Sequence, residues 1–178
     1  PAPAIPAPAH RADLEKIIKR RVLPNGLEVI VIENHGVPLV TVELDVRNGS
    51  FTQSPEFAGL AHMYEHMFFK ANRRYPEPDE FIDRLSQAGA VFNGTTSEER
   101  VNYYMTAPAD RLGESIGLMA SALREPLFLQ DELERERVVV LGEYDRNESN
   151  PFFTLTQAMD AKLWPGLESR KNTIGDRE

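Results

Sequence analysis

The sequence contains no cysteine among its 178 residues. This absence excludes disulfide bonds, thiol catalysis and thiolate-ligated metal sites, and it leaves the cellular compartment open. No run of 18 apolar residues occurs, so no segment is predicted to span a membrane. Basic residues are in the minority, with 20 Lys and Arg against 28 Asp and Glu and a formal charge of −8. We therefore expect no nucleic-acid partner, because a protein that binds nucleic acid needs a basic face.

The remaining composition is that of a folded domain, with 41% apolar and 27% charged residues. The exception is the start of the chain, where residues 1–12 are rich in Pro and Ala and are predicted to form an extended tail. This tail resembles the spacer that often follows a cleaved signal peptide, so a periplasmic or secreted location is a hypothesis. Residues 13–178 are expected to form one α+β domain.

Turn signals and apolar periodicity predict the element order β-β-β-α-α-β-β-α-α-α, an α+β fold with a mostly antiparallel sheet and helices packed on one face. An Asn25-Gly26 turn predicts a hairpin at the start. Ser54, followed by a proline and an acid, predicts the N-terminus of a helix that reaches about residue 70. Asp131 and Glu134 resemble a capping box for a helix that reaches about residue 150. Later strands are expected at 27–33, 39–47, 90–96 and 100–107.

One segment carries a chemical pattern, His-x-x-Glu-His, formed by His62, Glu65 and His66. On a helix the two histidines lie about 40° apart in projection and one turn apart along the axis, so both imidazoles can reach one metal ion. Glu65 lies about 60° to the other side of His62, close to a metal-bound water but badly placed as a third ligand. On an ordinary apolar helix, two adjacent imidazoles and a carboxylate would be buried without partners, which is costly. The pattern therefore predicts a metal site.

A catalytic zinc site needs a third protein ligand and leaves the fourth position to water. His10 lies in the tail and His35 on a predicted turn, so the third ligand should be an acid. Glu136 and Glu143 share one stripe of the helix that starts near residue 131. Their spacing alone does not choose between them. Three acids nearer the ends of that helix are expected to be solvated: Glu132, Glu134 and Glu148.

Several segments together resemble one known family. They are LPNGLEVIVIEN, GLAHMYEHMFFK, NGTTSEERVNYY and ERERVVVLGEYDRNESNP. From about Arg21 to its end, the sequence resembles the pitrilysin/insulysin family of zinc metallopeptidases, which includes the mitochondrial processing peptidases. One departure is Gly94, where this family usually has Ala.

The resemblance implies a zinc-dependent endopeptidase with one Zn²⁺ per chain, held by His62, His66 and Glu143. Zinc in this family lowers the pKa of its water and polarises the scissile carbonyl. The resemblance makes Glu65 the general base and Glu136 a supporting residue of the site, so these two are the catalytic candidates.

The resemblance also implies how substrate binds. Asn93, Gly94 and Thr95 would lie on an edge strand to which an extended peptide adds by β-augmentation. Asn93 also fits a plain turn ahead of Gly94. Tyr103 and Tyr104 fit the core and the sheet face better than a catalytic role.

Members of this family are usually far longer and contain two similar α/β halves around a substrate chamber. The chain resembles most of the first half, the metallopeptidase (LuxS/MPP-like) half-domain, incomplete at its C-terminal end. We therefore expect the isolated chain to hold metal but to cleave peptides poorly, and we leave open whether it pairs with a second half-domain or forms a homo- or hetero-oligomer. The alternatives are a non-catalytic, peptide-binding partner subunit of such a peptidase and a structural zinc domain.

Overall fold

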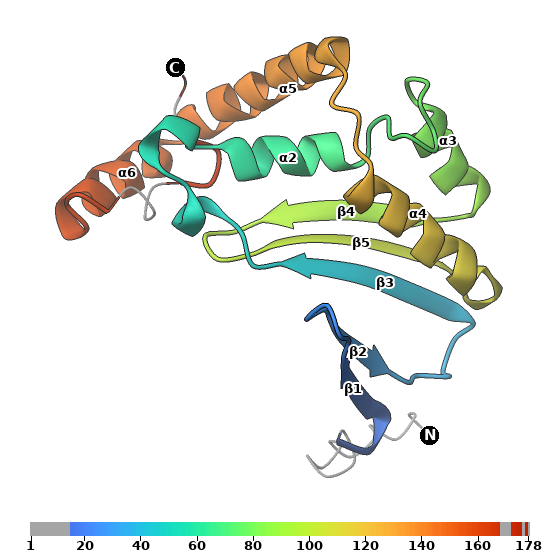
Figure 1. Ribbon diagram of the computed structural model, residues 1–178. Helices are drawn as coiled ribbons and strands as arrows, with labels where there is room; N and C mark the ends of the chain where they lie inside the picture. The colour runs from blue at the N-terminus through green and yellow to red at the C-terminus, as the bar shows by residue number, and fades with distance from the viewer. Residues whose placement is uncertain (1–14, 168–171, 176, 178) are drawn as a thin grey trace, which may run out of the picture. The chain divides into compact units, whose positions relative to one another are not determined.

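The computed structural model describes residues 15–167, 172–175 and 177, so the predicted tail at 1–12 lies outside the described residues. The chain divides into two compact units, residues 1–38 and 39–178. The element order is the predicted one, and the fold class, α+β with antiparallel strands, is confirmed (Figure 1). No helix within the described ranges is long and apolar enough to cross a bilayer.

The first unit contains the predicted hairpin. Strands β1 (Ile18–Val22) and β2 (Glu28–Ile32) pair in antiparallel register. The Leu23 amide donates to the Leu27 carbonyl at 2.8 Å, and Gly26 has a φ of 86°. This positive φ is the conformation that favours glycine in the turn.

The second unit is built on a three-stranded antiparallel sheet of β3 (Leu39–Val46), β4 (Val91–Thr96) and β5 (Val101–Pro108). The strand order is β3-β5-β4, so β5 is central and β4 is an edge strand. Within the described residues, β4 pairs with β5 alone, and its other side is unpaired. The sheet therefore keeps one free edge at β4.

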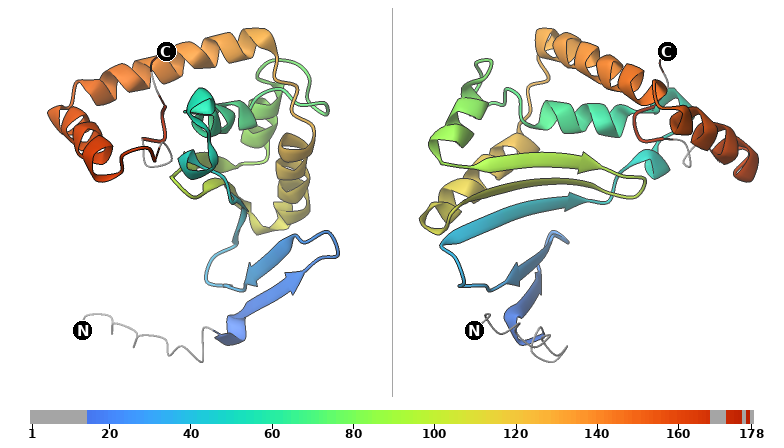
Figure 2. Two further views of the ribbon diagram at one scale, coloured as in Figure 1. Left: turned by 60° about the vertical axis from the view of Figure 1, so that its left-hand side comes forward. Right: turned by 180° about the vertical axis from the view of Figure 1, so that it is seen from behind.

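Helices cover one face of this sheet, as Figures 1 and 2 show for α2 (Leu60–Phe68) and α4 (Leu112–Arg124). The Phe68 ring stacks on the Tyr103 ring with centroids 3.7 Å apart, and Tyr103 is almost fully buried, as expected for a core residue. Helix α3 (Glu80–Gln87) adds Phe81 and Leu85 to the same core. As predicted, alternate residues of β5 are buried: Val101, Tyr103, Met105 and Ala107.

Helix α2 begins later than the sequence signals predict. Residues Pro55–Phe57 form a separate 3₁₀ turn, and Ser54 makes no side-chain capping hydrogen bond. Gly59 has a φ of 88°, which no α-helical residue adopts, so the helix starts only at Leu60. Gln53 supplies the cap instead, because its Oε1 accepts from the Ala61 amide at 3.1 Å. The predicted start at Ser54 is therefore wrong.

The capping box predicted for α5 (Gln130–Glu148) is also wrong, because Leu129 is the N-cap residue and provides no side-chain acceptor. Glu134 accepts from Gln130 Nε2 at 2.9 Å instead. The next helix, α6 (Pro151–Leu163), does have a side-chain cap, because the Asn150 Oδ1 accepts from the Phe152 amide at 3.0 Å.

Candidate metal centre

Helices α2 and α5 lie side by side and run in opposite directions (Figures 1 and 2). Carboxylates of α5 meet α2 and the residues just after it at three successive levels: Glu143 beside His62 and His66, Glu136 beside His66 and Lys70, and Glu132 beside the Ala71 amide. The interface between the two helices is therefore polar along one stripe of α5.

At the first level, His62, His66 and Glu143 converge. Glu143 Oε2 lies 3.5 Å from His62 Nε2 and 3.6 Å from His66 Nε2. One ligand atom from each of the three residues lies within 4.8 Å of the other two, and no other such group of His, Asp or Glu occurs in the described part of the chain. Ligands about 2.0–2.2 Å from a tetrahedral zinc lie about 3.4 Å apart, so this donor set fits Zn²⁺.

At the second level, Glu136 bridges His66 and Lys70. The His66 Nδ1 lies 3.1 Å from Glu136 Oε2, and the Lys70 ammonium lies 2.6 Å from Glu136 Oε1. Burial alone would raise the pKa of Glu136, but hydrogen bonds from Lys70 and His66 outweigh it and hold the pKa below its usual value. Glu136 is thus an anion that accepts a hydrogen bond from the His66 Nδ1–H, and this tautomer leaves the His66 Nε2 lone pair facing Glu143.

The surroundings of His62 favour its neutral form. Burial lowers the pKa of His62, and the neighbouring His66 lowers it further, while Glu65 and Glu143 act in the opposite direction. The His62 Nδ1 is buried and has no hydrogen-bond partner among the described residues. A neutral imidazole is the form that ligates metals, so the electrostatics of this pocket suit ligation.

Glu65 lies beside the ligand cluster but outside it. Its Oε2 accepts a hydrogen bond from the Thr96 hydroxyl at the end of β4. No described residue donates to its Oε1. Glu65 therefore faces the edge strand, on the other side of α2 from Glu136.

The three residues expected to bind substrate lie on β4. Asn93 and Thr95 are exposed, whereas Gly94 faces α2 and is half-buried. The Asn93 Oδ1 accepts from the Gly94 amide at 2.9 Å. A Cβ at Gly94 would lie 2.6 Å from Glu65 Cγ, so the departure from the family's usual Ala coincides with a close approach of Glu65 to the strand.

Two contacts of the site were not anticipated from the sequence. Lys70 follows His66 by four residues, so helical spacing could have placed it on the same face. Thr96 follows Gly94 by two residues, so strand alternation could have placed it on the face that meets Glu65.

One expectation about α5 is wrong. Glu132, expected to be solvated, is 3% exposed, and both of its carboxylate oxygens face the Ala71 amide, at 3.3 and 3.4 Å. Ala71 follows the end of α2, so the chain just after α2 contacts the first turn of α5 at this point. Exposed Glu134 and Glu148 match the expectation.

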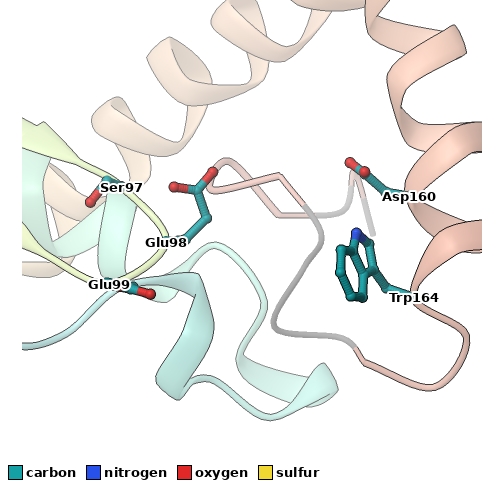
Figure 3. A pocket seen from close by; sticks show the side chains of 5 residues that line it. All are labelled: Ser97, Glu98, Glu99, Asp160 and Trp164. Atoms are coloured by element: carbon teal, nitrogen blue, oxygen red, sulfur yellow. The ribbon is translucent and has the colours of Figure 1, made fainter.

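A separate hollow of about 340 Å³ lies between the β4–β5 turn and α6 (Figure 3). It is lined by Ser97, Glu98, Glu99, Asp160 and Trp164. None of the predicted metal, catalytic or substrate-binding residues lines it, so it is distinct from the cluster on α2 and α5.

The model of the insulinase family, peptidase family M16, matches residues 28–176. The chain belongs to this family. The resemblance seen in the sequence is thereby confirmed, and with it membership of a family of metal-dependent peptidases.

Relatives of the insulinase family agree. The chain is 33% identical over 135 residues to the human insulin-degrading enzyme, which covers 76% of this chain and 13% of that protein. It is 30% identical over 138 residues to the insulin-degrading enzyme homolog of Dictyostelium discoideum, a match that covers 78% of this chain and 14% of that protein. It is 28% identical over 156 residues to a Caenorhabditis elegans protein named as a candidate zinc protease, a match that covers 88% of this chain and 18% of that protein. The chain thus spans less than a fifth of the length of these curated relatives.

A solved structure shows the same fold. The crystal structure of a protease from Helicobacter pylori superposes with a TM-score of 0.82 at 24% identity, covering 89% of this chain and 38% of that one.

Proposed function

We propose that this chain carries the zinc-binding part of an endopeptidase that hydrolyses extended peptides. The observation that carries the proposal is the geometry of α2 and α5. Two imidazole nitrogens and the Glu143 carboxylate converge within 4.8 Å, and a second carboxylate, Glu65, stands beside them without joining the cluster. A metal and an adjacent free base are the two parts that metal-assisted hydrolysis of an amide uses.

His62, His66 and Glu143 would hold the zinc, which would supply Lewis acidity and make a water molecule more acidic. Glu65 accepts the proton of the attacking water and then delivers it to the nitrogen of the leaving amine. The carboxylate regains its charge when the C–N bond breaks, so one residue serves as base and then as acid.

Glu136 acts through His66. Its charge fixes the Nδ1–H tautomer of His66 and the orientation of the ring, which makes Nε2 a better ligand. Lys70 holds the other oxygen of Glu136 and keeps the carboxylate ionised.

The free edge of β4 is the proposed substrate platform. Its outer side is unpaired within the described residues, and Gly94 on this strand lies against Glu65. An extended peptide that adds to this edge forms main-chain hydrogen bonds around Asn93, Gly94 and Thr95. Its backbone then runs close to the proposed base.

Because the chain spans a small part of its relatives, the experiment uses the full-length protein. We expect one Zn²⁺ per protein, lost in His62→Ala or His66→Ala, as measured by elemental analysis after dialysis. Glu65→Gln should keep the zinc and lose peptide hydrolysis by about 10²–10⁴-fold, because an amide cannot accept the proton. Glu143→Gln should instead weaken zinc binding by at least about 10–100-fold.

Two outcomes would overturn the proposal. Loss of zinc in Glu65→Gln with retention in Glu143→Gln would reverse the two roles. Stoichiometric zinc in the wild type without cleavage of a mixed peptide pool would favour the non-catalytic, peptide-binding subunit instead.

A further inference from the structure

We infer that Thr96 is the positioning residue of the proposed base: its hydroxyl holds one oxygen of Glu65 and leaves the other free to take a proton. The inference rests on the proposed function, in which Glu65 is that base. The Thr96 Oγ1–H donates to Glu65 Oε2, and Oε1 receives no hydrogen bond from any residue in the described ranges. The carboxylate therefore has one anchored oxygen and one available oxygen.

Gly94 is the second residue of β4 that positions Glu65. Gly94 and Thr96 are two residues apart on β4 and so present to the same face of the sheet, the face that α2 covers. Glu65 Cγ lies over the Gly94 backbone, only 2.6 Å from where a Cβ would be. The stem of Glu65 thus rests where the strand has no side chain, and its carboxylate reaches the next inward-facing residue, Thr96.

Hydrogen bonds fix the end of β4 that carries Gly94 and Thr96. Thr96 opposes Val101 at the end of the β4–β5 ladder, and the Ser97 amide then donates to the Arg100 carbonyl at 2.8 Å. The β4–β5 turn is also hydrogen-bonded to the segment before α2, because the Phe51 amide donates to the Glu98 carbonyl at 2.8 Å. A hydroxyl on such a strand is preorganised, unlike one on a mobile loop.

The Thr96 hydroxyl donates a directional hydrogen bond, and substitution can distinguish this role from the packing of the side chain. Valine has nearly the shape of threonine and an equal preference for strands, but it cannot donate a hydrogen bond. Serine keeps the donor and loses only the methyl group. The pair Thr96→Val and Thr96→Ser therefore isolates the hydrogen bond.

The experiment compares the full-length wild type with Thr96→Val, Thr96→Ser and the control Thr41→Val. Thr41 lies on β3, and its exposed hydroxyl bonds the Thr106 hydroxyl at 2.8 Å, so the control removes one hydroxyl from the same sheet away from the site. We expect Thr96→Val to keep its zinc and its thermal stability, and to keep its KM within about twofold. We expect its kcat to fall by about 10–100-fold, the usual effect of removing a partner that orients a site residue. Thr96→Ser should recover most of the lost kcat, and Thr41→Val should match the wild type.

Crystal structures of wild type and Thr96→Val give a second readout that needs no turnover. We expect the Glu65 carboxylate to leave its wild-type position when the hydroxyl is removed. An unmoved carboxylate, an unchanged kcat, or a failure of serine to rescue would each overturn the inference. If the wild type cleaves no peptide, the proposed function fails, and the crystal structures alone still decide whether Thr96 positions Glu65.

Discussion

Replacing Glu136 with Gln tests how far the proposed metal site depends on a residue outside the proposed ligand set. Glu136 accepts from His66 Nδ1 at 3.1 Å and from Lys70 Nζ at 2.6 Å, and its side chain is 14% exposed. The substitution keeps the shape and one acceptor oxygen but removes the charge. It leaves the Lys70 ammonium without a carboxylate.

The magnitude follows from the type of hydrogen bond lost. A bond to a charged group contributes about 1.5–3 kcal/mol and a neutral one about 0.5–1.5 kcal/mol, so each of the two bonds weakens by about 1–1.5 kcal/mol. The His66 bond acts directly on a ligand, and the Lys70 bond acts through it. A loss of about 1.4–2.7 kcal/mol in zinc binding results, which is about 10–100-fold in Kd.

The assay is zinc affinity, measured by competition with a chromogenic chelator. Glu134→Gln is the matched control, because Glu134 lies on the same helix, is exposed, and bonds only Gln130 among the described residues. Lys70→Met should fall between the two variants, because it removes the partner of Glu136 and leaves the His66 bond. Equal zinc affinities for Glu136→Gln and Glu134→Gln would refute the reasoning.

Two further predictions concern stability. Gly49→Ala should lower the free energy of unfolding by about 1–3 kcal/mol in urea titrations, because a Cβ would lie 2.3 Å from the Ser97 carbonyl oxygen and 2.6 Å from that of Glu98; Gly113→Ala, where a Cβ meets nothing within 4 Å, is the control, and equal effects would contradict the prediction. In the metal-free protein, burial and His66 hold the pKa of His62 below its usual 6.5, so the unfolded chain takes up this proton first. The stability that His62 contributes is complete above pH 6.5 and is lost as pH falls through the folded pKa, so the Tm of the metal-free protein should fall as the pH is lowered below 6.5. A smaller fall in His62→Gln identifies the residue.

Sequence periodicity was sufficient for the element order because each helix and strand has its own apolar repeat and its own turn residues. It failed at helix starts. Ser54 has the features of an N-cap, but the local signal cannot reveal that Gly59 adopts a left-handed conformation and that Gln53 caps α2 from outside the helix. Nor does any local pattern specify that β1 and β2 form a sheet separate from that of β3, β4 and β5.

The candidate site divides in the same way. His62, Glu65 and His66 could be predicted because their spacing alone sets their angles on a helix. The choice of Glu143 over Glu136 as the proposed third ligand needed the family resemblance, since both acids share one stripe of α5. The burial of Glu132 could not be predicted, because it depends on where the chain after α2 crosses α5.

The polar contact between α2 and α5 has a consequence for how the chain is tied together. The proposed ligands His66 and Glu143 are separated by 77 residues, and α3, β4, β5 and α4 all lie within that interval. A metal ion held by both helices would therefore be a cross-link that closes a long loop, in a chain that has no cysteine to form one. By the entropy of loop closure, a cross-link over about 77 residues is equivalent to about 4.5 kcal/mol. Removal of the metal with a chelator would open that loop, and the helix pair would then depend on its remaining side-chain contacts to stay closed.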